Sequence, residues 1–323
     1  AKLMDTKKQI KQAVEISKLY YLDGATQSQI AKQLNLSRPT VSRALQYARD
    51  TNIVKIQVTD PLQDIAGLRQ QLMSKFKLKN VLIATPAGEG QAALLAALGK
   101  ATADYLPQVV TDNDVLGISW GQTLDAVAKH LSISERQGVQ ITYLKGTVAN
   151  STHNNYVVEV TKRFNECFHT QAQILPLPVI FANQKVKEMV TQDRFIDNVI
   201  ATMMKTTVAI FTVGTTAPDA TLFELGYLSP AEVQSLQQTA VGDIISQFVN
   251  QQGQIVNQEL TARTMAFPID RLRGLHDSIL VAGGAKKLPA IRAALAGNYA
   301  NTLVTDVDVA QQLHIHRLRQ AAD

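Results

Sequence analysis

The sequence predicts an α/β protein in which a small helical module precedes a doubly wound, Rossmann-like parallel sheet. Short apolar runs alternate with helical patterns from Val81 onward, which is typical of such a sheet. The 323 residues also exceed the size at which one core usually suffices, so two domains are expected. The expected strands are 81–84, 115–119, 139–144, 208–213, 279–282 and 303–306, and the expected helices are 91–106, 122–131, 156–168, 194–204 and 288–295.

Three short helices are expected before residue 60. Apolar residues at helical spacing mark the first helix, which residues 23–24 end. They are Ala13, Val14, Ile16, Leu19 and Tyr20. Thr26 and Gln29 have the spacing of a capping box and open the second helix. Ser37 is a good N-cap for the third helix, and Pro39 falls in its first turn.

The second and third helices have the arrangement of a helix-turn-helix, which places its last helix in the major groove of DNA. Arg38 and Arg43 have the reach for guanine edges or phosphates, and the hydroxyls of nearby residues can bond either. Residues 53–59 alternate like a strand and are expected to form a wing. The candidate DNA contacts are Gln27, Ser28, Arg38, Thr40, Ser42 and Arg43.

The distribution of charge favours a polyanionic partner for this module. Residues 1–60 contain 10 Lys and Arg against 5 Asp and Glu, so they carry the whole net charge of +5. The remainder has 22 basic and 22 acidic residues and is neutral overall. A small helical bundle with a solvated charged face is the alternative, but the local excess favours double-stranded DNA as the partner.

A linking helix is expected between the two domains. Its apolar stripe is formed by Leu62, Ile65, Leu68, Leu72 and Phe76. Two such stripes could pair and give a homodimer or homotetramer; the alternative is that the stripe packs on the neighbouring domain. The expected domains are therefore a DNA-binding domain (1–60), a linker helix (61–78) and a ligand-binding domain (79–323).

Composition limits the remaining classes of function. No apolar run approaches the roughly 20 residues of a membrane helix, and the N-terminus has no signal-peptide core, so we expect a cytoplasmic protein without a membrane partner. The single cysteine, Cys167, excludes an internal disulfide framework. His314 and His316 have no cysteine or acidic partner at ligand spacing, so no metal is expected.

Four expected strands end in glycine-containing loops, several of them with small or hydroxylic residues, at 119–121, 145–147, 214–216 and 283–284. Glycine lets backbone N–H groups close around an anion, which makes these loops candidate phosphate-binding sites. Each signal alone is weak, because glycine after a strand is common for steric reasons. Four loops at one edge of a sheet carry more weight. The candidate ligand-binding residues in them are Ser119, Lys145, Gly146, Thr147, Gly214, Thr215 and Gly284.

Lys145 has the most specific chemistry among these candidates. It directly follows the apolar run 139–144 and should lie at the carboxyl edge of the sheet. Burial there would disfavour the charged ammonium and leave a nucleophilic amine that condenses with an aldehyde to a Schiff base. On these residues alone, a lysine that ends a strand and points to water is the more common case.

Several motifs resemble the SorC family of bacterial transcriptional regulators. The resemblance covers nearly the full length and implies a helix-turn-helix followed by a sugar-phosphate-binding domain related to sugar-phosphate isomerases. The motifs are LNLSRPTVSRAL (34–45), LPLPVIF (175–181), FTVGT (211–215), LGYLSPAE (225–232), AVGDI (240–244) and VAGGAKK (281–287).

Leu144, Lys145 and Gly146 also resemble one branch of that family, the Bacillus-type deoxyribonucleoside regulators. These carry LKGG, in which the lysine forms a Schiff base with deoxyribose 5-phosphate. Here Thr147 replaces the second glycine; threonine tolerates fewer backbone conformations but adds a hydroxyl that can bond phosphate. The resemblance implies that Lys145 binds deoxyribose 5-phosphate as a Schiff base, with deoxyribose 1-phosphate or another phosphosugar as alternatives.

Two functions remain compatible with these residues. The first is a repressor of deoxyribonucleoside or sugar catabolism that binds operator DNA and is controlled by a phosphorylated sugar, without a cofactor. The second is a sugar-phosphate isomerase or aldolase-like enzyme with an appended DNA-binding module, which would need an acid or base beside Lys145. Asp243 and Lys287 are candidates for that role, and the sequence is equally compatible with a role for both in binding the ligand. The basic recognition helix favours the regulator, so no enzyme activity is expected.

Overall fold

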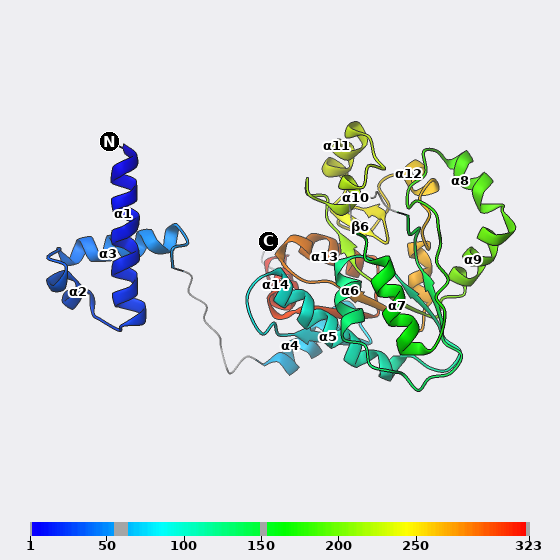
Figure 1. Ribbon diagram of the computed structural model, residues 1–323, viewed down its shortest axis with the longest axis horizontal. Helices are drawn as coiled ribbons and strands as arrows, with labels where there is room; N and C mark the ends of the chain where they lie inside the picture. Colours follow the sequence, from blue (N-terminus) through cyan, green and yellow to red (C-terminus); the bar gives the residue numbers. More distant parts are fainter. Residues whose placement is uncertain (1, 55–63, 149–153, 321–323) are drawn as a thin grey trace. The chain divides into compact units, whose positions relative to one another are not determined.

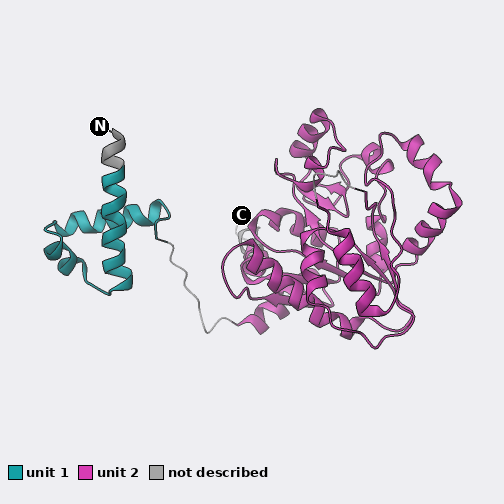
Figure 2. Ribbon diagram, in the orientation of Figure 1, with its two compact units in different colours: residues 1–63 teal, residues 64–323 magenta. Residues whose placement is uncertain are grey.

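The structure is a computed structural model that describes residues 2–54, 64–148 and 154–320. The chain forms two compact units, residues 1–63 and residues 64–323 (Figure 2). Each unit has its own apolar core. The helical module and the α/β domain expected from the sequence are therefore both present.

The first unit consists of helices around a small core (Figure 1). Its elements are α1 (Lys2–Ser17), a π-helical turn (Lys18–Leu22), α2 (Gln27–Gln33) and α3 (Arg38–Asp50). Ile16, Ile30, Val41 and Leu45 are buried together, one from α1, one from α2 and two from α3. This core confirms the three expected helices.

The expected helix caps in this unit are also confirmed. Thr26 and Gln29 form the reciprocal hydrogen bonds of a capping box. The Ser37 side chain accepts the N–H of Thr40, with Pro39 in the first turn of α3. Residues 55–59 of the expected wing lie outside the described residues, so the structure does not test the wing.

The second unit is built on a six-stranded parallel sheet in the order β1-β9-β8-β4-β2-β3. All six strands expected from the sequence are in it. From β2 the chain continues to β3 at one edge of the sheet, and then through β4, β8 and β9 towards the other edge. The direction therefore reverses between β2 and β4, which flank a topological switch point. The strands are β1 (Asn80–Ala84), β2 (Val115–Ile118), β3 (Gln140–Tyr143), β4 (Val208–Phe211), β8 (Asp277–Val281) and β9 (Thr302–Asp306).

The sheet is covered on both faces because its strands are apolar at successive positions. In β4, Val208 and Ile210 belong to one core cluster while Ala209 and Phe211 belong to the other. The first cluster packs against α5 (Gln91–Val109), α6 (Gln122–Lys129) and α7 (Val157–Phe168), which follow one another along that face (Figure 1). The opposite face packs against α4 (Ile65–Phe76), α9 (Arg194–Met204), α13 (Leu288–Ala296) and α14 (Val307–Gln320).

Helix α4 corresponds to the expected linker helix, but it belongs to the second unit. Leu68 and Leu72 on its apolar stripe are buried in the core that α4 shares with α14 and β1. The alternative in which the stripe packs on the neighbouring domain therefore holds, and these two leucines are not a free pairing surface. Leu62 lies outside the described residues.

One expected strand is divided. Residues 208–213 form β4 and, after Thr212, the short β5 (Val213–Gly214), which leaves the parallel sheet. Strand β5 pairs antiparallel with β6 (Gly242–Ile244), and β6 pairs with β7 (Gln247–Val249). Because β5 directly continues β4, this second sheet starts at the carboxyl edge of the first sheet.

Several other elements were not expected from apolar periodicity. Most are short or amphipathic over too few residues to give a clear pattern. They are α8 (Gln184–Thr191), α10 (Thr221–Glu224), α11 (Pro230–Thr239), α12 (Gln258–Ala262) and the 3-10 helices Ile269–Gly274 and Ala285–Lys287.

Candidate functional site

Lys145 lies immediately beyond β3 in a backbone segment that is held on both sides. The N–H of Phe267 donates to the carbonyl oxygen of Leu144 (2.7 Å), and the N–H of Gly146 donates to that of Met265 (2.9 Å). A side chain at Gly146 would overlap the backbone oxygens of Leu177 and Pro178. This close packing leaves the Lys145 side chain only 9% exposed, so it does not point to water.

The Lys145 ammonium lies between an indole and a hydroxyl. Its Nζ is 4.0 Å from the centroid of the Trp120 ring and donates a hydrogen bond to Ser246 Oγ (3.3 Å). The Nε1–H of Trp120 in turn donates to the carbonyl oxygen of Gly146 (2.8 Å). The loops after β2 and β3 are therefore joined around the amine.

Burial controls the charge of this lysine. The pKa of Lys145 is lowered from 10.5 to about 8: desolvation is the main cause, the charge of Asp243 opposes it, and the nearby Lys287 adds a smaller lowering effect. Near neutral pH a much larger fraction of this side chain is therefore the neutral amine than in an ordinary lysine. Lys145 is therefore suited to nucleophilic attack on an aldehyde.

Asp243 and Lys287 belong to the same cluster. Desolvation raises the pKa of Asp243, although Lys145, the Ser246 N–H and Lys287 all favour its carboxylate. Desolvation also lowers the pKa of Lys287, whose Nζ donates to Thr212 Oγ1 (3.1 Å). The site thus holds two amines with lowered pKa values and one carboxyl group with a raised pKa.

A tight hairpin turn between β6 and β7 brings Ser246 and Asp243 into the site. Ile245 (φ 48) and Ser246 (φ 64) both have left-handed backbone conformations, as a two-residue type I′ turn requires. The branched side chain of Ile245 makes this conformation unfavourable, so the surrounding fold must stabilise it. The turn directs the N–H of Ser246 to Asp243 Oδ2 (2.8 Å) and its hydroxyl to Lys145.

Three of the expected phosphate-binding N–H groups already have protein acceptors. Those of Gly146 and Thr147 donate to the carbonyl oxygens of Met265 and Leu175, and that of Gly284 donates to Asp306 Oδ2 (2.7 Å). The Thr147 hydroxyl also donates to the Leu175 carbonyl oxygen (2.8 Å). These groups shape the loops, and their expected role in binding a phosphate stays a prediction.

The loop after β5 retains free donors. The N–H groups of Thr215 and Thr216 have no acceptor within the described residues. Gly214 faces the Asp243 carboxylate so closely that any side chain at 214 would displace it. Ser119, at the end of β2, is 2% exposed, and its Oγ has no hydrogen-bond partner among the described residues.

The DNA-binding candidates lie mostly on the surface of α2 and α3. Arg38, Ser42 and Arg43 are exposed, whereas Val41, Leu45 and Ala48 of the same helix face the core. Ser28 is exposed, while Gln27 and Thr40 are partly buried; the Thr40 hydroxyl is hydrogen-bonded to Ser37 Oγ (2.8 Å). Helix α3 therefore presents one face with two arginines and a serine.

Sequence reasoning missed Trp120 and Ser246. Trp120 offered a signal, because it is the only tryptophan and directly follows the candidate Ser119 at a strand end. Ser246 offered none, because its position depends on the antiparallel hairpin and on a contact with a lysine 101 residues away.

Two further observations limit the kinds of site. No helix among the described residues is long and apolar enough to cross a membrane. In the same part of the chain, no group of three or more His, Cys, Asp or Glu side chains is placed to hold a metal ion.

A helix-turn-helix unit followed by an α/β unit with a buried lysine at its carboxyl edge defines a ligand-controlled transcriptional regulator. Sequence profiles agree: that of the "Putative sugar-binding domain" matches residues 60–314, and that of "Sigma-70, region 4" matches residues 15–51. The chain belongs to the SorC family of transcriptional regulators.

Individual relatives are similar over almost the whole chain. The deoxyribonucleoside regulator of Bacillus subtilis is 40% identical over 310 residues, which cover 96% of this chain and 99% of the relative. The sorbitol operon regulator of Klebsiella pneumoniae is 26% identical over 313 residues, 96% of this chain and 99% of that one. The crystal structure of full-length SorC from K. pneumoniae superposes with a TM-score of 0.71 at 25% identity, covering 95% of this chain and 99% of that chain.

Proposed function

We propose that this protein is a repressor of deoxyribonucleoside or sugar catabolism whose operator affinity is controlled by deoxyribose 5-phosphate, bound as a Schiff base to Lys145. The observation that carries the proposal is the buried amine of Lys145, whose pKa is lowered to about 8. The similarity to a deoxyribonucleoside regulator supports the choice of sugar.

The bond forms by condensation. The neutral amine attacks C1 of the open-chain aldehyde, and one of its two N–H protons passes to the carbonyl oxygen, which becomes a hydroxyl. A second proton, from an acid in the site, converts this hydroxyl to water, which leaves as the nitrogen lone pair forms the C=N bond; the resulting iminium keeps one N–H and one positive charge. Asp243 is the proton source in this proposal, because desolvation raises its pKa and so favours the protonated carboxyl group beside the amine.

The phosphate is assigned to donors that the protein leaves free. These are the N–H groups of Thr215 and Thr216, together with the Lys287 ammonium. Ser119 and Gly214 complete the proposed site: Ser119 offers an unpartnered hydroxyl, and Gly214 leaves room for the Asp243 carboxylate. Gly146, Thr147 and Gly284, whose N–H groups have acceptors within the protein, shape the loops of the proposed site.

On the DNA side, α3 is the proposed recognition helix. Its proposed contacts with bases and phosphates are made by Arg38, Thr40, Ser42 and Arg43. At the start of α2, Gln27 and Ser28 are proposed to contact the sugar-phosphate backbone of the DNA. Helix-turn-helix proteins usually bind two half-sites, so we propose a homodimer or homotetramer. Sedimentation should show at least a dimer; a monomer that binds the operator with full affinity would contradict this assembly.

For the sugar to control DNA binding, the protein must bind the sugar with different affinities in its DNA-bound and DNA-released states. A ligand shifts an equilibrium only by its differential affinity, so the adduct must form more readily in the DNA-released protein. Deoxyribose 5-phosphate should therefore lower operator affinity. Unchanged or increased affinity would argue against a sugar-released repressor.

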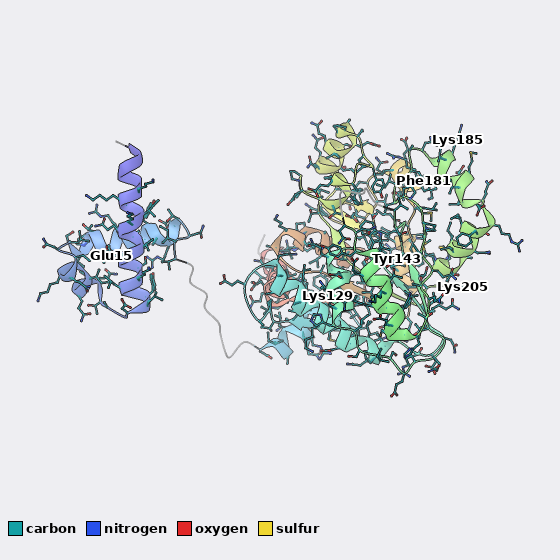
Figure 3. All side chains as sticks on the ribbon, in the orientation of Figure 1. Glu15, Lys129, Tyr143, Phe181, Lys185 and Lys205 are labelled. Atoms are coloured by element: carbon teal, nitrogen blue, oxygen red, sulfur yellow. The ribbon has the colours of Figure 1, made fainter. Side chains whose placement is uncertain are left out.

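The test combines trapping with a DNA-binding readout. Wild-type protein is treated with borohydride and deoxyribose 5-phosphate, and the modified peptide is mapped by mass spectrometry. Operator fragments selected from genomic DNA by the wild-type protein are then used for release measurements with Lys145→Arg, which keeps the charge but cannot form an imine. Lys205→Arg makes the same change on an exposed lysine at the outer edge of the unit (Figure 3).

The expected results are an adduct on Lys145, normal DNA binding by both variants, and loss of the sugar response in Lys145→Arg alone. An adduct on another lysine, or a normal response of Lys145→Arg, would contradict the covalent sensor. Because Asp243 could also act as an acid or base in aldol chemistry, the same incubation is assayed for sugar-phosphate turnover. Sustained turnover would support the enzyme alternative.

A further inference from the structure

The indole of Trp120 is a fixed wall beside the reactive amine. The residue is 4% exposed and packs in the core formed with α6 and α7. Its Nε1–H donates to the carbonyl oxygen of Gly146 (2.8 Å), which anchors the ring to the loop that carries Lys145. The Nζ of Lys145 lies over the ring, 4.0 Å from its centroid. Burial and this hydrogen bond therefore hold the ring in place beside the amine.

The position of the amine restricts the first two carbons of a bound sugar. In a Schiff base the C=N bond to Nζ is about 1.3 Å long and the C1–C2 bond about 1.5 Å, so C2 lies about 2.5 Å from Nζ. Because Nζ itself is 4.0 Å from the ring centroid, C2 contacts the indole when the sugar chain runs along the face of the ring. In a 2-deoxy sugar this atom is a methylene, whereas in an ordinary aldose it carries a hydroxyl.

The hydroxyl that contacts the amine offers a C2 hydroxyl little compensation. A polar group that loses water against an apolar ring is penalised unless it gains a hydrogen bond. Ser246 Oγ already accepts from Lys145 Nζ (3.3 Å), and the iminium retains one N–H for it. A methylene, in contrast, gains contact with the ring.

We propose that Trp120 is a specificity-determining residue that makes this site select 2-deoxy aldehydes over their 2-hydroxy counterparts. The inference rests on the proposed Schiff base at Lys145 and deepens it by assigning the chemical class of aldehyde. Discrimination comes from desolvation of the C2 hydroxyl, so it does not depend on the side of the carbon that carries the hydroxyl.

The first test uses the wild-type protein. Borohydride trapping on Lys145 is measured against concentration for deoxyribose 5-phosphate, ribose 5-phosphate and its C2 epimer, arabinose 5-phosphate. Trapping of the same sugars on Nα-acetyllysine corrects for their different fractions of free aldehyde. Beyond that reference, we expect a preference of roughly ten- to a hundredfold for the deoxy sugar over both epimers.

Rejection of only one epimer would indicate a directed clash or hydrogen bond and would overturn the proposal. Equal trapping of all three sugars would also overturn it while leaving the Schiff base intact. If no sugar gives an adduct on Lys145, the proposed function itself fails. These outcomes distinguish failure of the proposed Schiff base from failure of the proposed selectivity, and they need only the wild-type protein.

Two substitutions then assign the effect to the ring. Trp120→Phe keeps an apolar face but loses the Nε1–H bond to Gly146, and it should retain most of the corrected preference. Trp120→Asn supplies an amide partner for a C2 hydroxyl, so the preference should fall towards the Nα-acetyllysine value. A folded Trp120→Asn protein with undiminished preference would remove Trp120 from this role.

Discussion

The backbone N–H of Ser246 donates to Asp243 Oδ2 across 2.8 Å, within the hairpin that also directs the Ser246 hydroxyl to Lys145. One turn thus orients a carboxyl group and a hydroxyl around a single amine. The charge of Asp243 supports the protonated form of Lys145, and desolvation opposes it. The balance between these two effects sets the fraction of reactive amine and leads to the first two predictions.

Asp243→Asn should lower the pKa of Lys145 below about 8, because the substitution removes the negative charge that favours the ammonium. The midpoint of the pH profile for borohydride trapping should move to lower pH. Asp219→Asn removes the same charge from an exposed ion pair with Lys286 and should leave the profile unchanged. An unmoved midpoint in Asp243→Asn would show that this carboxyl group carries no charge beside Lys145.

The buried charge should also make stability depend on pH. The folded pKa of Lys145 lies below its unfolded value of 10.5, so the folded protein binds this proton less tightly than the unfolded chain. Below about pH 8 the buried ammonium lowers the free energy of unfolding by its full desolvation cost, and this cost disappears as the pH rises to 10.5.

Relative to the wild type, Lys145→Met should therefore lose a few kcal/mol of free energy of unfolding between about pH 8 and pH 10.5. Urea unfolding of the second unit across this range provides the measurement. Lys205→Met is the exposed control, for which no such trend is expected. A constant difference between Lys145→Met and the wild type would mean that the amine is not desolvated.

Gly146→Ala should destabilise the second unit by about 1–3 kcal/mol and reduce trapping on Lys145. The added methyl group would overlap the backbone oxygens of Leu177 and Pro178, which cannot move without shifting the segment that positions the lysine. Gly274→Ala is the matched control, because a methyl group there meets no atom within 4 Å. Thermal unfolding and trapping yields compare the two, and equal behaviour would show that the close packing at Gly146 is unimportant.

Arg38→Ala and Arg43→Ala should each weaken operator binding by about 1–3 kcal/mol if the arginine contacts a base, without affecting sugar trapping. Arg49→Ala removes the same charge near the other end of α3, where the guanidinium donates to Gln46. It should have a smaller effect. Equal losses in all three variants would indicate a purely electrostatic contribution, and no loss in Arg38→Ala and Arg43→Ala would remove the recognition-helix assignment.

The sequence by itself determined the elements whose signals are local. The six parallel strands follow from continuous apolar runs, because a strand buried on both faces needs apolar side chains at every position. The caps at Thr26 and Ser37 follow from spacing, since each side chain bonds an N–H only three residues away. The place of Lys145 at the carboxyl edge follows from the end of β3, because parallel strands end at a common edge.

Only the tertiary structure decided what surrounds that lysine. The hairpin that carries Ser246 depends on two left-handed residues, one of them an isoleucine, and no local preference predicts such a turn. The loop N–H groups of Gly146 and Thr147 were assigned to a phosphate from sequence, yet they bond to Met265 and Leu175, which lie far away in the chain. Strand periodicity places a residue at an edge, whereas hydrogen-bond partners and desolvation arise from segments that meet only in the folded protein.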